Sequence, residues 1–168
     1  MQVALAVVGS IVAALLDTSV APFAMIGGAR PDVVLVTSVV VCVSIGSEAG
    51  FVWAFAGGLT LDLLSAPARP VGSSVVALLV ATGIAALVAR FAGRNRLVTA
   101  IAVTFPLTFV FQLTFALLVA AALGGVPAAN PVGSALPAAI ENTVLAVPLA
   151  LVARWIWLRW GVYDRIDW

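Results

Sequence analysis

Four acidic side chains lie inside long apolar stretches of this chain, where a charge is costly. They are Asp17, Asp32, Asp62 and Glu141, and two arginines, Arg30 and Arg69, lie in the turns nearest to them. A carboxylate in an apolar setting can carry a proton, bind a small ligand, or accept hydrogen bonds from neighbouring segments. Such groups should pair or face the interior of the fold, so we expect the six residues to form one polar cluster.

The residues that usually complete a catalytic or metal site are missing from the sequence. There is no histidine, and the single cysteine, Cys42, lies in an apolar run where a small buried hydrophobe is expected. Walker, GxSxG, HExxH and CxxC patterns are absent. We therefore expect no enzymatic activity, no cofactor and no metal. The cluster then has three open interpretations: it locks helices together, it docks a partner's transmembrane or extracytoplasmic segment, or it binds a small ligand or protons.

The composition indicates that lipid surrounds these residues. Hydrophobic residues make up 64% of the 168 residues and charged residues 9%, against about a quarter charged in a soluble domain. The net charge of +1 argues against a nucleic-acid partner. We predict an all-α, polytopic membrane protein with about six transmembrane helices and a single integral membrane domain over residues 1–168. The expected spans are 2–20, 31–45, 49–64, 72–91, 97–123 and 135–160. The second and third are short, so a hairpin that stops short of one membrane face remains an alternative.

Arginine placement predicts the orientation of these spans. An even number of spans puts both termini on the side of the 46–48 and 90–96 turns. That side carries six of the eight basic residues, all of them arginine, and the other side carries Arg30 and Arg69. The positive-inside rule then makes both termini cytoplasmic. The first span lacks the basic start of a signal peptide, so we expect it to be uncleaved. Trp155, Trp157 and Trp160, together with Arg159, are typical of an interfacial anchor.

Small residues at four-residue spacing predict where helices pack closely. They are Gly50, Ala54 and Gly58 in the third span, and Ser73, Ala77, Ala81, Ala85 and Ala89 in the fourth. Helices in lipid associate through close backbone approach, so we expect a packing seam there. Thr104, Thr108 and Gln112 share one face of the fifth span around Pro106. That face predicts hydrogen bonds between helices or a ligand cavity.

An ordered set of short motifs between Arg30 and Gly72 resembles the rod shape-determining protein MreD family. The motifs are Arg30-Pro31-Asp32 followed by aliphatic residues, Gly50-Phe51, Gly57-Gly58-Leu59, Asp62-Leu63-Leu64-Ser65, and Pro70-Val71-Gly72. One extra residue separates Phe51 from the glycine pair, relative to the family pattern. The family-type positions are Pro31, Asp32, Gly58 and Asp62.

The resemblance implies a non-catalytic scaffold in the bacterial cytoplasmic membrane. Such proteins pair with the bitopic protein MreC and act with the RodA glycosyltransferase and a class B penicillin-binding transpeptidase. They connect indirectly to MreB filaments and support lateral peptidoglycan synthesis and rod shape. Their architecture looks like the substrate-binding component of energy-coupling-factor (ECF) vitamin transporters. A vitamin-binding transporter component is therefore the alternative function. A proton- or ion-coupled carrier is disfavoured, because the sequence has no inverted repeat.

Overall fold

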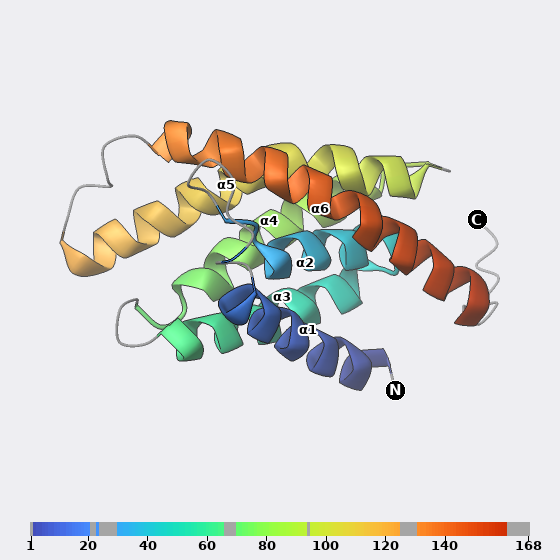
Figure 1. The fold of residues 1–168 in the computed structure, drawn as a ribbon, viewed down its shortest axis with the longest axis horizontal. Coiled ribbons are helices and arrows are strands. Elements are labelled where there is room, and N and C mark those ends of the chain that lie inside the picture. The colour runs from blue at the N-terminus through green and yellow to red at the C-terminus, as the bar shows by residue number, and fades with distance from the viewer. Residues whose placement is uncertain are drawn as a thin grey trace.

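The computed structural model is a bundle of α-helices with no strand in the residues that it describes, which confirms the all-α prediction (Figure 1). The described residues are 2–20, 23, 30–65, 70–93, 95–124 and 131–160, with the side chains of 2, 3, 131–134 and 156–160 left aside. The helices are α1 (Gln2–Ser19), α2 (Val33–Ser44), α3 (Ser47–Ser65), α4 (Ser73–Ala89), α5 (Arg96–Leu123) and α6 (Pro131–Trp160).

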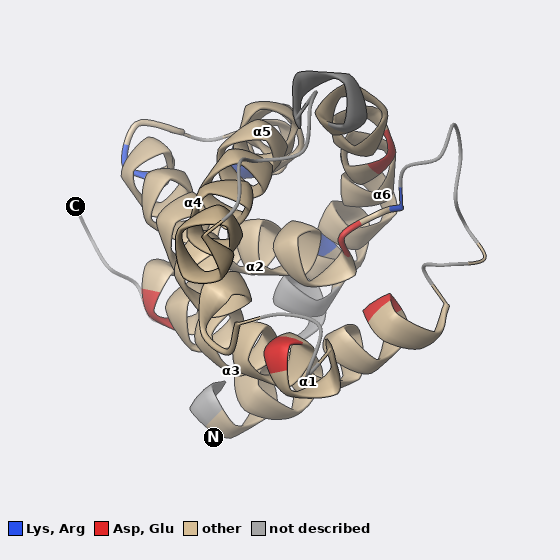
Figure 2. Cartoon of the chain, turned by 90° about the vertical axis from the view of Figure 1, so that its left-hand side faces the viewer, with Lys and Arg blue, Asp and Glu red and all other residues tan. Residues whose placement is uncertain are grey.

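The short helix α2 forms the centre of the bundle. It contacts each of the five other helices, and Figure 2 shows it surrounded by them. Nine of its twelve residues are buried, and valine and leucine dominate this set. An all-round apolar helix is typical of a position inside other helices. The shortness of α2 therefore has a physical explanation, because α2 is covered by protein on most sides.

The outer helices follow one another around α2 in the order α1, α3, α4, α5, α6, each contacting the next. Within the described residues, α6 and α1 share no substantial contact, so the ring is open between them. Successive helices run in alternating directions, and α1 begins at the same end of the bundle as α6 ends (Figure 1). The turns at 45–46 and 90–95 lie at that end as well.

Three helix starts differ by two or more residues from the sequence expectation, and the third helix begins at Ser47 rather than at 49. The sixth helix begins at Pro131, four residues before the expected 135, because proline suits the first helical turn, where an N–H would have no acceptor. It continues through Pro137 and Pro148. The second helix begins at Val33 with Asp32 as its N-cap residue, rather than at Pro31.

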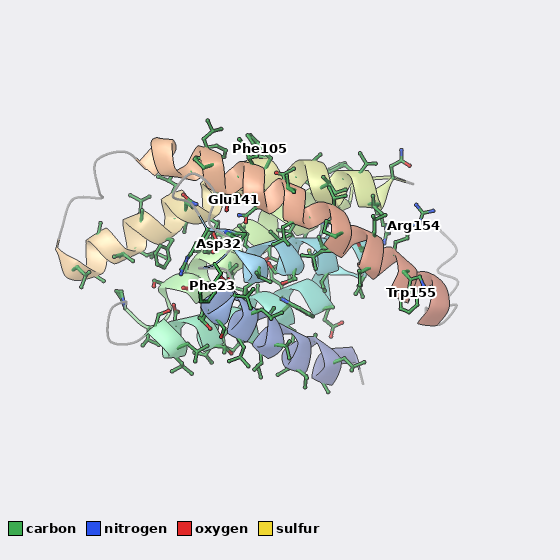
Figure 3. All side chains as sticks on the ribbon, in the orientation of Figure 1. Phe23, Asp32, Phe105, Glu141, Arg154 and Trp155 are labelled. Carbon is green, nitrogen blue, oxygen red and sulfur yellow. The ribbon has the colours of Figure 1, made fainter. Side chains whose placement is uncertain are left out.

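The bundle is packed with small and polar residues inside and large aliphatic residues outside. Apart from α2, its buried positions are mostly alanine, serine, threonine, asparagine and aspartate. Large exposed apolar side chains lie on every outer helix: Leu5 and Val8 on α1, Phe55 and Leu63 on α3, Val76 and Leu87 on α4, Leu113 and Leu117 on α5, and Ile140 and Leu151 on α6. Figure 3 shows these outer surfaces densely covered by hydrocarbon side chains.

Two helices are long and apolar enough to cross a membrane, namely residues 96–123 and 135–155. Three more apolar helices, 4–19, 33–44 and 73–89, are shorter than that criterion. By length and composition, then, two membrane-crossing segments are supported among the described residues.

Candidate functional site

Asp62, near the end of α3, caps the start of α4. Its side chain is completely buried. One carboxylate oxygen accepts a hydrogen bond from the backbone N–H of Gly72 at 2.7 Å, and the other accepts from Ser74 N–H at 3.1 Å. Gly72 has a φ of +99°, a conformation that favours glycine. The carboxylate thus satisfies amides that a helix start leaves without an acceptor, and its charge complements the helix dipole.

Asp17, near the end of α1, plays the same part at the start of α2. It is 2% exposed, and its carboxylate accepts a hydrogen bond from the backbone N–H of Val34 at 3.4 Å. Val34 is the second residue of α2, so this amide has no acceptor within the helix. A carboxylate of one helix therefore supports the N-terminus of the next in both cases.

Asn142, on α6, completes the cap of α2 and connects it to α5. Its side-chain oxygen accepts a hydrogen bond from Asp32 N–H at 2.7 Å, and its amide nitrogen donates to Thr108 Oγ1 at 3.1 Å. The Thr108 hydroxyl donates in turn to the carbonyl of Thr104 at 2.9 Å. All three polar side chains are fully buried. This chain of bonds joins α2, α6 and α5 at mid-bundle.

Asn142 was absent from the candidates chosen from sequence. A signal for it existed, because it lies in an apolar helix on the same face as Ala135, Ala139, Ala146, Ala150 and Ala153, all of them buried. That alanine face of α6 was likewise missed. On α5, Thr104 and Thr108 occupy the polar face noted in the sequence, whereas Gln112 is only half-buried.

The remaining cluster candidates lie nearer the surface. Asp32, Glu141 and Arg30 are half-buried, and the side chain of Asp32 makes no cap hydrogen bond to its own helix. Figure 3 places Asp32 and Glu141 in the same part of the bundle, as the bond between Asp32 and Asn142 requires. Arg69 lies outside the described residues. The structure thus divides the expected cluster between two sites, the start of α2 and the start of α4.

The chemistry that these groups support is hydrogen bonding to backbone amides. Asp62 engages both of its oxygens in this way and Asp17 at least one. No group of three or more histidine, cysteine, aspartate or glutamate side chains that could hold a metal ion occurs among the described residues. The buried acids are therefore best described as links between helices.

Small residues bring the backbones of α3, α4 and α2 together. A Cβ atom added to Gly58 would lie 2.8 Å from the Cα of Val75 on α4, and one added to Gly50 would lie 2.7 Å from the Cα of Cys42 on α2. The two glycines thus face different neighbours. Of the other residues assigned to the seam, Ser73, Ala54, Ala77, Ala81 and Ala85 are buried, and Ala89 is half-buried.

The aromatic residues expected at the membrane interface lie along the last turns of α6. Trp155 is 55% exposed beside the exposed Arg154, at the end of the bundle where α1 begins (Figure 3). The backbone of Trp157, Arg159 and Trp160 continues the helix, and their side chains lie outside the described part of the chain.

Comparison of this chain with protein-family models, with curated proteins and with solved structures finds no significant match. The case for a function therefore depends on the chain's own residues and their geometry.

Proposed function

We propose that this chain is a non-catalytic, multi-pass scaffold of the bacterial cell-elongation machinery, of the MreD type, with both termini in the cytoplasm. It holds an MreC-like bitopic protein and supports lateral peptidoglycan synthesis by a RodA glycosyltransferase and a class B penicillin-binding transpeptidase. Its connection to MreB filaments is indirect. The motifs from Arg30 to Gly72 suggest the family, and the geometry of the bundle supports a role in assembly.

The observation that carries the membrane assignment is the distribution of side chains, which is the opposite of that in a water-soluble protein. Large aliphatic residues cover all five outer helices, while buried positions of these helices are mostly small or polar. Water-soluble monomers rarely expose continuous apolar surface beyond a few hundred square ångströms. Lipid as the surrounding solvent removes the penalty of that exposure, and close packing of small residues is how helices associate there.

The shortness of several helices is compatible with this assignment. The helix α4 has 17 residues and α1 has 18, so they measure about 26 and 27 Å, close to a hydrocarbon core of about 30 Å. The central helix α2 has 12 residues and does not have to match the bilayer. Irregular backbone at its ends is tolerated where protein surrounds it, and Asp17 and Asn142 accept hydrogen bonds from its first amides.

The open side of the ring supports a place for a partner's single span. A helix among helices of equal diameter has room for about six neighbours, and α2 has five. Asp32 N–H bonds to α6 and Val34 N–H bonds to α1, so the start of α2 lies between those two helices. Val33, Thr37 and Ser44 share one face of α2 and are only half-buried, and the Thr37 hydroxyl accepts a hydrogen bond from Trp53 Nε1 of α3 at 2.8 Å. One additional transmembrane helix would close the ring.

Site-specific photo-cross-linking tests this proposal. A photo-reactive residue is placed at Ile11 or Val152, exposed positions on the two helices beside the opening, and at Val80, an exposed position on the opposite helix α4. We expect an adduct with a single-span MreC-like protein from Ile11 or Val152 and none from Val80. Adducts from Val80 alone would contradict the docking side. A vitamin retained by the purified protein, without any such adduct, would favour the transporter component.

A further inference from the structure

A cleft of about 530 Å³ lies at the end of the bundle where α1 begins. It opens between the end of α2, the start of α3, the end of α4 and the start of α5. Its volume is in the range of small-molecule sites, about 300–1,000 Å³. The acids of the capping sites do not contribute to it.

The lining of the cleft combines cationic and apolar groups. Arg90 and Arg96 are exposed at the two ends of the turn between α4 and α5, while Phe51 and Leu87 supply apolar wall. The described lining residues include no aspartate or glutamate, and Glu48, in the first turn of α3, is exposed outside it. Guanidinium groups are suited to a phosphate group, because arginine binds phosphate oxygens through two parallel hydrogen bonds.

We infer that this cleft binds the headgroup of an anionic phospholipid, with the phosphate at Arg90 and Arg96 and the start of an acyl chain against Phe51 and Leu87. The inference rests on the proposed membrane placement, which puts this end of the bundle at the cytoplasmic interface. Anionic lipids are concentrated in that leaflet and attract juxtamembrane arginines. A soluble phosphate would use the arginines but would gain nothing from the apolar wall.

Gly83 keeps the cleft open. A Cβ atom added to Gly83 would meet a single neighbour, the ring of Phe51 at 3.9 Å, so a larger side chain can enter the cleft without striking the backbone. Gly83→Leu is therefore a steric block, and the double variant Arg90→Gln, Arg96→Gln removes the charge. Arg154→Gln is the matched control, because Arg154 is an exposed arginine at the same end of the bundle but does not line the cleft.

Native mass spectrometry of the full chain in non-ionic detergent, titrated with phosphatidylglycerol or phosphatidylcholine, measures the binding. We expect phosphatidylglycerol to bind at least about tenfold more tightly than phosphatidylcholine. The arginine double variant should lose at least about tenfold in this affinity, Gly83→Leu should abolish binding, and Arg154→Gln should leave it unchanged. Equal affinity for the two lipids, or an equal loss in Arg154→Gln, would overturn the inference. So would displacement of the lipid by inorganic phosphate at equal concentration, which would indicate a site for a free anion.

The same variants separate this inference from the proposed function. Partner cross-linking from Val152 does not involve the cleft, so its yield should be unaffected by Gly83→Leu. Selective lipid binding without a partner adduct would leave the lipid site standing and refute the scaffold. A partner adduct without lipid selectivity would support the scaffold and refute the lipid site.

Discussion

At the scale of single residues, Asp62 offers the sharpest test of the capping interpretation. Asp62→Leu leaves the half-buried amide of Gly72 and the buried amide of Ser74 without acceptors, at about 1–3 kcal/mol for a buried amide. We expect a loss of about 2–5 kcal/mol in the free energy of unfolding. Asp62→Asn should lose roughly half of that, since one oxygen remains while the new NH₂ group faces an N–H donor. Denaturation of the purified protein in mixed micelles measures both changes.

The control for this comparison is Glu48→Gln, an exposed acid in the first turn of the same helix. It should change the free energy of unfolding by less than about 0.5 kcal/mol. An Asp62→Leu protein as stable as the wild type would refute the cap.

Asn142 should behave as a structural link rather than a surface polar group. Asn142→Leu removes the acceptor for Asp32 N–H and the donor to Thr108, so we expect a loss of about 1–3 kcal/mol in the free energy of unfolding. The neighbouring Thr143→Val is the matched control. Among the described residues, the Thr143 hydroxyl bonds to the carbonyl of Ala139 in its own helix, and its removal should cost less than about 0.5 kcal/mol. Equal effects of the two substitutions would contradict the cross-helix role of Asn142.

Burial of the acids could be predicted from sequence, but their partners could not. The cost of a charge in lipid indicates that Asp17 and Asp62 should face the interior, and both do. Their hydrogen-bond donors are backbone N–H groups of Val34, Gly72 and Ser74. Every residue except proline has a backbone N–H, so the sequence does not show which amide an acid will bind. Arginine side chains are visible in the sequence, and the acids are therefore expected to cluster with them.

At the scale of helices, we expect substitution by alanine to have opposite effects at Gly58 and at Gly83. Gly58→Ala would place a methyl group 2.8 Å from the backbone of Val75, so α3 and α4 must separate. We expect a loss of about 1–3 kcal/mol in the free energy of unfolding. Gly83→Ala, on α4, meets only a side-chain atom at 3.9 Å and should be neutral or stabilising by up to about 1 kcal/mol. Denaturation in micelles compares them, and an equal loss from both would argue against close packing at Gly58.

The helices themselves could be predicted because proline and glycine punctuate the chain so regularly. The central position of α2 could not. Its run of valines is strongly apolar, which fits both a lipid-facing span and a helix enclosed by others. The choice depends on contacts with five helices spread over the whole sequence, and no local pattern reports them.

At the scale of the whole molecule, the proposed orientation in a membrane is open to direct measurement. In a Cys42→Ala background, single cysteines are placed at Val71 and Asn95, exposed positions at opposite ends of α4 and its flanking turns. We expect a membrane-impermeant maleimide to label Val71→Cys in intact cells, and Asn95→Cys only after permeabilisation. Labelling of both cysteines in intact cells would refute the six-span arrangement. Labelling of Asn95→Cys alone in intact cells would show the opposite orientation, with both termini outside.

The dependence of α2 on distant acceptors has a consequence for biogenesis. Its first turn is secured by Asp17 from the start of the chain and by Asn142 from the last helix. During synthesis the ribosome therefore releases α2 long before half of its support exists. Twelve apolar residues are a poor independent signal for lateral release into lipid. In the proposed membrane placement, the first turn of α2 is complete only after α6 has been made, so a truncation that removes Asn142 should leave this turn without one of its two cross-helix acceptors.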